Sequence, residues 1–375
     1  MKPIPKPIRV LIVDDSAVVR KALADALAQD PEIEVVGTAS DPYVAREKIL
    51  ELRPDVLTLD LEMPRMDGLT FLRILRQHYP LPVVVVSSLT PSGSQAALAA
   101  LEAGAVDVLG KPTSAWSIGN LTPQLIPRIK AAATARMPTH RKGPQAQGGQ
   151  PLLKSANFSR HPWQVILIGA STGGTEAIRE VLTCLPSGLP PILIVQHIPP
   201  VFSKAFADRL GQSCTFQVRE ASHGEPLQPN LALIAPGDYH MRLVWAGGQL
   251  RVHLSQDPPL HHTRPAVDHL FQSAATTVGR YAVAVLLTGM GNDGAEGMRA
   301  IKRAGGYNIA QDEQTCVVFG MPRAAIAAGV VDQILPLHQI PEGIMRALSQ
   351  NRSIAPNSGS LPAASMGSSK TNANP

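Results

Sequence analysis

The chain has 375 residues, of which 44% are hydrophobic and only 4% are aromatic. This length exceeds what one core usually serves, so we expect two domains with cores built from aliphatic side chains. The net charge is +5, but the basic residues are scattered and not interleaved with aromatic residues, which argues against a nucleic-acid partner.

Residues 8–130 alternate short apolar runs with amphipathic stretches. Apolar residues within the stretches, such as Val19, Leu23 and Leu27, recur four apart and predict helices. Five such strand-and-helix units predict a parallel sheet with helices on both faces. The strands are expected at residues 10–13, 35–37, 56–59, 83–86 and 106–109.

The composition changes at residues 131–161, which are rich in Ala, Pro, Gly, Gln, Lys and Arg and have no sustained apolar period. We interpret them as a linker. A second alternating region, 162–348, has strand-like runs at 165–168, 192–195, 231–234 and 282–287. The predicted fold class is therefore α/β, with two doubly wound parallel-sheet domains, the first flavodoxin-like and the second Rossmann-like. The tail, 351–375, is Ser, Asn, Pro and Ala with almost no charge and is predicted to be disordered.

Polar residues follow the strands of the first domain. Asp14 and Asp15 follow the first strand, Asp60 ends the third, Ser87 ends the fourth, and Lys111 follows the fifth. The carboxyl ends of parallel strands meet at one edge of a sheet, so we expect these side chains to converge. Three neighbouring carboxylates suit Mg²⁺, and one of them can then accept a phosphoryl group that Lys111 and Ser87 would contact. The alternative is that each aspartate only caps a helix or a turn.

Residues 13–16 (VDDS), 59–68 (LDLEMPRMDG) and 110–112 (GKP) resemble the receiver domain of two-component response regulators. The resemblance implies that a histidine kinase phosphorylates Asp60. It also implies Mg²⁺ bound by Asp14, Asp15, Asp60 and the backbone carbonyl of Glu62. The family usually has an aromatic residue shortly before the fifth-strand lysine, and residues 106–110 contain none.

A serine follows the first predicted strand of the second domain. Ser171 lies in the run 169–174 (GASTGG), which fits the G-x-S-x-G pattern of a nucleophile at a tight turn. The motif alone is equally compatible with a phosphate-binding loop or a plain turn. The next strand ends in Gln196 and His197, which places a base beside the serine, whereas a dinucleotide-binding fold favours an acidic residue there. Asp293, in the run 288–294 (TGMGNDG), is the candidate that would orient the imidazole.

Other histidines compete for the role of base. His240 also follows a strand, with Asp238 as a possible orienting group. The adjacent pair His261 and His262 invites a metal-site hypothesis, which we disfavour because adjacent residues on a strand or helix point in different directions.

Residues 162–348 are similar to the catalytic domain of chemotaxis protein-glutamate methylesterases. The matching runs are 169–174, 196–199 (QHIP), 235–240 (APGDYH), 288–294 and 316–322 (CVVFGMP). The resemblance implies a triad of Ser171, His197 and Asp293, with the Met290 backbone in the oxyanion hole. We add the backbone at the helix start, Thr172, as a second oxyanion donor.

These observations predict a phosphorylation-activated serine hydrolase that removes methyl groups from glutamyl methyl esters on chemoreceptors and deamidates glutamines. The esterase chemistry needs no cofactor. Two rivals stay open: a second domain that binds a nucleotide or partner without catalysis, and a hydrolase of small soluble esters.

The compartment is predicted from cysteines and apolar runs. Cys184, Cys214 and Cys316 are far apart and lack metal-ligand spacing, which fits free thiols in a reducing compartment. No apolar run approaches the roughly 20 residues that a membrane helix needs, and the first residues lack the apolar core of a signal peptide. We therefore expect a cytoplasmic protein with no segment inserted into a membrane.

Overall fold

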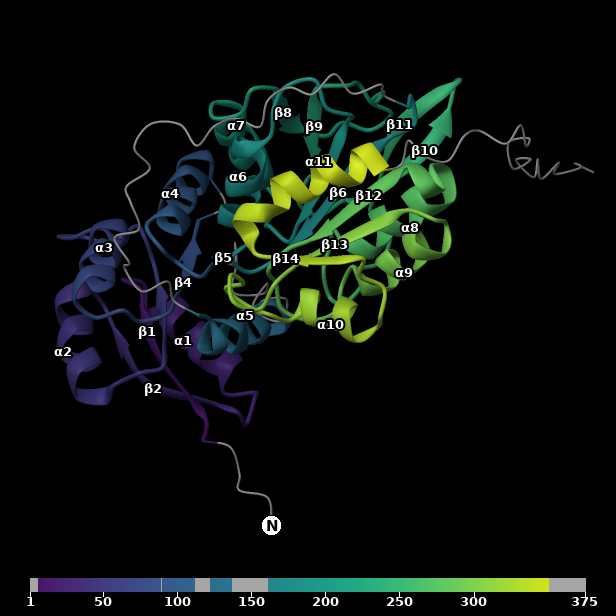
Figure 1. The fold of residues 1–375 in the computed structure, drawn as a ribbon. Helices are drawn as coiled ribbons and strands as arrows, with labels where there is room; N and C mark the ends of the chain where they lie inside the picture. The colour runs from purple at the N-terminus through teal and green to yellow at the C-terminus, as the bar shows by residue number, and fades with distance from the viewer. Residues whose placement is uncertain (1–5, 89, 112–121, 137–160, 351–375) are drawn as a thin grey trace, which may run out of the picture.

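The structure is a computed structural model that describes residues 6–88, 90–111, 122–136 and 161–350. It contains two α/β units (Figure 1), the first running from β1 to α5 and the second from β6 to α11. The predicted tail, and most of the predicted linker, lie outside the described residues.

The first unit is a five-stranded parallel sheet with the order β2-β1-β3-β4-β5. Its strands are β1 (Ile8–Val13), β2 (Ile33–Ala39), β3 (Val56–Leu59), β4 (Val83–Ser87) and β5 (Asp107–Gly110). Its helices are α1 (Ala17–Leu27), α2 (Pro42–Leu52), α3 (Gly68–His78), α4 (Pro91–Glu102) and α5 (Thr122–Thr134). Each predicted strand is present within a few residues of its expected position. The last helix continues to Thr134, whereas the sequence placed the domain boundary at residue 130.

The helices of this unit begin where short polar side chains cap free backbone amides. Asp41 accepts hydrogen bonds from the amides of Tyr43 and Val44, at 2.9 and 3.2 Å. Asp67 accepts one from Thr70 at 2.8 Å, which starts α3 directly after the loop that carries Asp60. The helix starts therefore fix the loops at the carboxyl edge of the sheet, where the acidic residues lie.

The second unit has a seven-stranded parallel sheet with the order β14-β13-β12-β6-β7-β9-β8 and a separate antiparallel hairpin of β10 and β11. The strands are β6 (Val165–Ala170), β7 (Ile192–Gln196), β8 (Gln217–Glu220), β9 (Leu231–Ile234), β10 (His240–Ala246), β11 (Gln249–Ser255), β12 (Ala282–Leu286), β13 (Tyr307–Gln311) and β14 (Gln333–Leu335). The helices are α6 (Gly174–Cys184), α7 (Phe202–Gly211), α8 (Val267–Thr277), α9 (Ala295–Arg303), α10 (Met321–Ala327) and α11 (Ile340–Gln350), with 3-10 turns at Gly279–Tyr281 and Leu337–Gln339. Both predicted parallel-sheet α/β domains are confirmed.

The chain reverses its direction of winding at β6, which lies between β7 and β12. Ligands and active sites of open parallel sheets form at such a switch point, outside the carboxyl ends of the strands. Ser171 follows β6, His197 follows β7, and Asp293 belongs to the loop between β12 and α9. The topology therefore gathers the three predicted residues at one edge.

The first unit packs against that edge of the second, with α4 beside α6 and α7 (Figure 1). Glu102 of α4 forms an ion pair with Arg209 of α7. Just after α5, the amide of Arg136 donates a 2.9 Å hydrogen bond to the carbonyl of Val317, and its guanidinium pairs with Glu313 at 2.7 Å. The contact between the units thus combines a helix interface with main-chain and ionic links.

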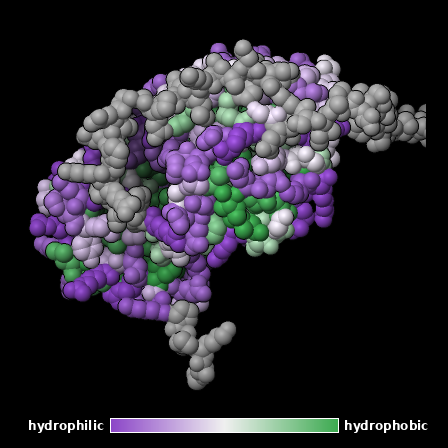
Figure 2. Space-filling view, viewed as in Figure 1, coloured by the Kyte–Doolittle hydropathy of each residue, from purple (hydrophilic) through white to green (hydrophobic). Residues whose placement is uncertain are grey.

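Figure 2 shows a mostly hydrophilic face on which apolar side chains gather over β14 and α10. Ile334 of β14, a strand of only three residues at the sheet edge, is 50% exposed. Short edge strands limit pairing with other chains. Among the described residues, no helix has the length and apolarity needed to cross a membrane.

Candidate active site

Ser171 occupies a tight connection between β6 and α6. The turn needs glycine at position 173, where φ is 77° and a Cβ atom would lie 2.6 Å from the Cβ of Val317. The amide of Ser171 donates to the carbonyl of Thr288 at 3.0 Å, which ties this turn to the end of β12. The serine is thus held rigidly between two neighbouring strand ends.

His197 lies between Ser171 and Asp293. Its Nδ1 is 3.1 Å from Ser171 Oγ, and its Nε2 is 2.8 Å from Asp293 Oδ2. With the ring proton on Nε2, facing the carboxylate, Nδ1 is left as an acceptor for the serine hydroxyl. This arrangement is that of a nucleophile, a base and an orienting carboxylate.

Asp293 is buried and held by the start of α8. Its Oδ2 accepts from the amide of Val267 at 2.7 Å, and its Oδ1 accepts from the amide of Asp268 at 2.9 Å. Burial opposes ionisation, but the hydrogen bond and charge of His197 and the two amides outweigh it and lower the pKa of Asp293. The carboxylate is therefore ionised and pinned in the orientation that His197 needs.

The backbone around Ser171 favours two amides as oxyanion donors. The amides of Ser171 and Gly289 already donate to the carbonyls of Thr288 and Val318, each at 3.0 Å. This favours the next amide in each segment, those of Thr172 and Met290, which line the same cleft as Ser171. Gly289 allows the two segments to approach, because a Cβ there would lie 2.7 Å from the Cβ of Ser171.

His240, the competing base, has a structural role. It is fully buried, and its Nδ1 accepts from the amide of Ala266 at 3.2 Å while its Nε2 lies 3.2 Å from the carbonyl of Pro258. Burial lowers the pKa of His240. Asp238 pairs with Arg264 at 2.6 Å and not with His240. His240 also begins β10, which the sequence did not predict.

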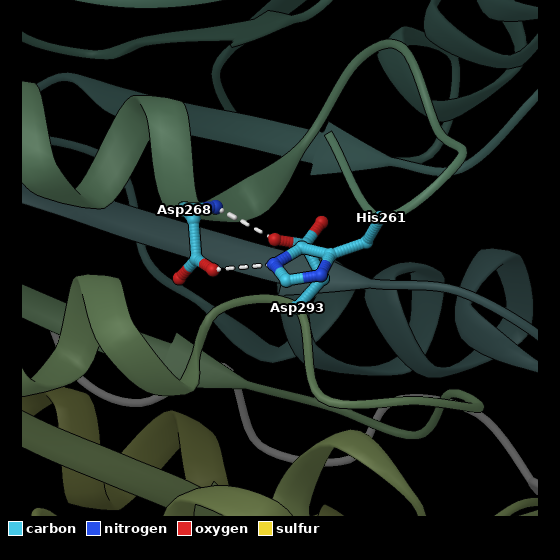
Figure 3. A group of neighbouring side chains, drawn as sticks. All are labelled: His261, Asp268 and Asp293. Carbon is cyan, nitrogen blue, oxygen red and sulfur yellow. Dashed lines mark hydrogen bonds and ion pairs between the residues drawn. The ribbon is translucent and has the colours of Figure 1, made fainter. Parts of the chain in front are cut away.

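Of the adjacent pair His261 and His262, the first contacts an acidic residue. His261 Nε2 lies 3.0 Å from Asp268 Oδ2 (Figure 3). His261, Asp268 and Asp293 have potential ligand atoms within 4.8 Å of one another. The sequence did not single out Asp268, because its role arises only from this tertiary contact.

The acidic residues of the first unit form the predicted cluster. Asp14, Asp15 and Asp60 have carboxylate oxygens within 4.8 Å of one another. Lys111 Nζ lies 2.9 Å from Asp14 Oδ2 and 2.7 Å from Asp60 Oδ2. Burial, aided by the charge of Asp14, raises the pKa of Asp60 despite Lys111. Excess buried negative charge of this kind is what a divalent cation neutralises, so the residues fit Mg²⁺.

The other predicted residues of this pocket lie next to the cluster. The amide of Glu62 donates to Asp60 Oδ1 at 3.2 Å, and the Glu62 carboxylate accepts from Ser88 at 2.9 Å. Ser87 is fully buried, and its hydroxyl donates to the carbonyl of Gly93 at 3.4 Å. Ser87 ends β4, where its carbonyl accepts from the amide of Lys111 at 2.7 Å, and its side chain is bonded to the start of α4.

Both units line the cleft at Ser171, whose volume is about 470 Å³. The hydroxyl of Thr172 donates a 2.5 Å hydrogen bond to Asp107 of β5, and Arg128 of α5 lies 3.7 Å from the other oxygen of Asp107. Sequence reasoning missed Asp107, because no local pattern distinguishes it from other strand-terminal aspartates.

Two family models match the chain. The one described as "CheB methylesterase" matches residues 166–344, and the one described as "Response regulator receiver domain" matches residues 10–120. The crystal structure of the Thermotoga maritima CheB methylesterase catalytic domain is 41% identical and covers 49% of this chain and 97% of that chain, with a TM-score of 0.48.

Relatives with both regions are similar over nearly the whole chain. Protein-glutamate methylesterase/protein-glutamine glutaminase 2 of Syntrophus aciditrophicus is 49% identical over 339 residues, which cover 90% of this chain and 98% of the relative. The protein of the same name from Cupriavidus pinatubonensis is 50% identical over 347 residues, covering 91% and 96%. The chain therefore belongs to the family of protein-glutamate methylesterases/protein-glutamine glutaminases that carry a response-regulator receiver domain.

Proposed function

We propose that this protein hydrolyses glutamyl methyl esters on methyl-accepting chemoreceptors and deamidates glutamine side chains there, with Ser171 as nucleophile. The observation that carries the proposal is the chain of contacts from Ser171 Oγ through His197 to the buried Asp293, at 3.1 and 2.8 Å. It lies within the region that matches the methylesterase family model.

The reaction follows from this geometry. His197 Nδ1 takes the proton of Ser171 as the hydroxyl attacks the γ-carbonyl, and Asp293 stabilises the imidazolium that forms. The amides of Thr172 and Met290 donate to the oxyanion. The tetrahedral intermediate expels methanol from an ester, or ammonia from an amide, with the proton returned by His197. Water, deprotonated by the same base, then hydrolyses the acyl-enzyme and restores Ser171 and a free glutamate.

The first unit takes a phosphoryl group from a histidine kinase. Asp60 is the acceptor, and Asp14, Asp15, Asp60 and the carbonyl of Glu62 would hold Mg²⁺. When bound, Mg²⁺ supplies the positive charge that offsets these carboxylates and the incoming phosphoryl oxygens. Lys111 bridges Asp14 and Asp60 and is placed to contact the phosphoryl group. Ser87, which pairs with Gly110 at the end of the neighbouring strand, is the hydroxyl that we assign to the phosphoryl group.

Phosphorylation activates the hydrolase by releasing the contact between the units. Support comes from Asp107, which accepts from Thr172 beside the nucleophile. Asp107 begins the strand that ends just before Lys111. A shift of Lys111 toward a phosphoryl group would therefore act on the same strand. Residues 106–110 contain no aromatic residue, so we assign the transmission to this polar contact with Thr172, the residue after Ser171.

The proposed substrate and the phosphodonor indicate the cellular compartment of this protein. The substrate side chains and the phosphodonor kinase are on the cytoplasmic side of a chemotaxis pathway, so we place the protein in the cytoplasm. The described cysteines, Cys184, Cys214 and Cys316, are all free thiols, which fits that compartment.

The test is methanol release from methylated receptor cytoplasmic fragments, with and without Mg²⁺ and a small phosphodonor. We expect stimulation by the phosphodonor in the wild type and a loss of at least ~10⁴-fold in Ser171→Ala. Full activity in a folded Ser171→Ala protein would overturn the proposed nucleophile. No release from a phosphorylated wild type would instead favour a binding role for the second unit.

A further inference from the structure

A strained turn lies beside the catalytic cleft. Leu260 and Thr263 exchange backbone hydrogen bonds of 3.1 and 2.9 Å, and the two central residues, His261 and His262, have φ values of 53° and 61°. A turn with two consecutive left-handed residues normally takes Asn or Gly, because side chains with a Cβ are strained there. A strained backbone conformation of this kind persists only where surrounding contacts stabilise it. The contacts of the side chains in this turn therefore indicate what role the turn has.

His261 reaches back from this turn to Asp268 on the first turn of α8 (Figure 3), with 3.0 Å between its Nε2 and Asp268 Oδ2. Asp268 is 1% exposed. Its other oxygen accepts from the amide of Gly297 at 2.7 Å. A Cβ at position 297 would lie 2.4 Å from the Cβ of Phe271, so the close approach of α9 depends on this glycine. Asp268 is therefore fixed by two donors from different segments.

Asp268 stands directly behind the orienting carboxylate of the catalytic site. Its amide donates to Asp293 Oδ1, and Asp293 Oδ2 receives His197 Nε2. Two buried carboxylates this close repel each other, and one of them takes up a proton unless donors stabilise both charges. Burial and the charge of Asp293 raise the pKa of Asp268, whereas the Gly297 amide and His261 oppose that rise. His261 is thus a side chain that stabilises the ionised form of Asp268.

A metal ion is a poor explanation of this cluster. Both oxygens of Asp293 accept backbone amides, both oxygens of Asp268 accept other donors, and His261 Nε2 faces Asp268. The lone pairs that a cation would need are already directed at N–H groups.

Other ionisable groups nearby do not take the place of His261 as a side-chain donor to Asp268. His269, the next residue of α8, packs on His240. Burial lowers the pKa of His269 to about 4, so it is neutral near pH 7. The surrounding charges are paired with one another: Arg242 with Asp257, Arg264 with Asp238, and Arg299 with Glu296.

We propose that His261 is a positioning residue of the hydrolase centre: it keeps Asp268 ionised, and the negative charge of Asp268 behind Asp293 favours the imidazolium that His197 forms during the reaction. The inference rests on the proposed function and adds two residues, His261 and Asp268, that act on the triad through Asp293. Removing the His261 imidazole lets Asp268 bind a proton, so the supporting charge is lost and His197 becomes a weaker base.

The turn provides a matched pair of variants. His261→Gly and His262→Gly both place glycine at a left-handed position and both remove an imidazole, but only the first removes the donor to Asp268. Asp268→Asn removes the charge and keeps an oxygen that can accept from Gly297. The experiment measures kcat and kcat/KM for methanol release from methylated receptor fragments across pH for these variants and for the double variant His261→Gly/Asp268→Asn.

We expect His261→Gly and Asp268→Asn each to lower kcat several-fold, with little change in KM. In the pH profile of kcat/KM, the acid limb should shift to lower pH by roughly 0.5 to 1 unit in both variants. The double variant should be no worse than either single variant, because the two residues act as one unit. His262→Gly should leave the acid limb where the wild type has it. An unshifted acid limb in His261→Gly, or additive losses in the double variant, would overturn the inference.

A second readout separates this inference from the proposed function. In the Ser171→Ala protein, ¹³C NMR of aspartate carboxyl carbons follows the titration of Asp268 without turnover. The Asp268 titration should move to higher pH when His261→Gly is added and stay unchanged with His262→Gly. If the wild type released no methanol, the proposed function would fail while this titration still decided the role of His261; an unmoved Asp268 titration would reject that role.

Discussion

The hydroxyl of Thr172, next to the proposed nucleophile, donates a 2.5 Å hydrogen bond to the carboxylate of Asp107 in the receiver domain. Both residues are buried, at 3% and 7% exposure. A hydrogen bond to a charged group is worth about 1.5 to 3 kcal/mol in such a place. This single contact therefore has the strength to bias the two domains toward the packed arrangement.

Asp107→Ala should raise the activity of the unphosphorylated protein. Losing about 1.5 kcal/mol or more from the packed state shifts its population by roughly tenfold, and basal methanol release should rise to a similar extent. The rise should shrink when the phosphodonor is added, because in the proposed mechanism phosphorylation already releases the contact between the units. Asp25→Asn is the control, since Asp25 pairs with Lys21 on the exposed surface of α1. Equal basal rates in the wild type and a folded Asp107→Ala protein would show that the contact does not restrain the enzyme.

The ion pair between Glu102 and Arg209 should matter much less. Both side chains are about two-fifths exposed, and exposed pairs contribute about 0 to 1 kcal/mol. Glu102→Arg or Arg209→Glu should each raise basal activity only a few-fold, because each puts like charges across the interface. The exchanged pair, with both substitutions, should return basal activity toward that of the wild type. If the increases in basal activity caused by the two single substitutions were additive in the double variant, the two side chains would not interact.

The strands that the sequence predicted are those whose apolar runs are uninterrupted, such as β3 and β9, whose predicted and observed bounds coincide. The strands it missed carry polar residues. In β13, Asn308 and Gln311 are fully buried and bonded to neighbouring segments, so the strand lacks a hydrophobic signature. Edge strand β8 exposes Gln217 and Arg219 in alternation with a buried Val218. Tertiary burial, not local pattern, places these strands in the sheet.

The residues of the candidate site also divide into those that local sequence predicts and those that depend on tertiary contacts. Ser171, His197 and Asp293 could be predicted because each follows a strand of one parallel sheet, and parallel strands end at a common edge. Their catalytic roles stay a prediction until activity is measured. Asp107 and His261 could not be found in this way. Asp107 acts 65 positions away, across a domain boundary, and the contact of His261 depends on a turn with left-handed residues that its sequence does not favour.

Asp60→Asn should stabilise the receiver domain in the absence of Mg²⁺. Asp60 is buried with a raised pKa, so the folded protein binds its proton more tightly than the unfolded chain does. The stability from this group is present at low pH and lost as pH rises through its folded pKa. At pH 7 the ionised carboxylate therefore costs stability, which Mg²⁺ should restore. Each kcal/mol corresponds to about 2 to 4 °C in Tm for a domain of moderate size.

Thermal unfolding checks this prediction. Mg²⁺ should raise the Tm of the wild type at pH 7 and have little effect near pH 4, where protonation of Asp60, whose pKa is raised, competes with the metal. Without Mg²⁺, Asp60→Asn should have a higher Tm than the wild type, and its Tm should respond weakly to added Mg²⁺. An undiminished Mg²⁺ response in Asp60→Asn would place the ion elsewhere.

Asp293→Asn should nearly abolish catalysis while preserving the fold. The carboxylate accepts three hydrogen bonds, from His197 and from the amides of Val267 and Asp268. An asparagine has only one acceptor oxygen, so in either orientation its NH₂ group faces at least one N–H. With NH₂ toward His197, the imidazole must carry its proton on Nδ1, and it can no longer accept the proton of Ser171. The equivalent tautomer error in a serine protease triad costs about 10⁴-fold in kcat.

The unsatisfied contact should also destabilise the protein by about 1 to 3 kcal/mol, visible as a lower midpoint of urea unfolding. Asp238→Asn is the matched control, because Asp238 lines the same cleft but pairs with Arg264, and it should keep its kcat within a few-fold of the wild type. Retention of most of the activity in Asp293→Asn would mean that His197 is oriented by another group. Activity lost equally in both variants would point to substrate binding in the cleft, because the tautomer argument applies to Asp293 alone.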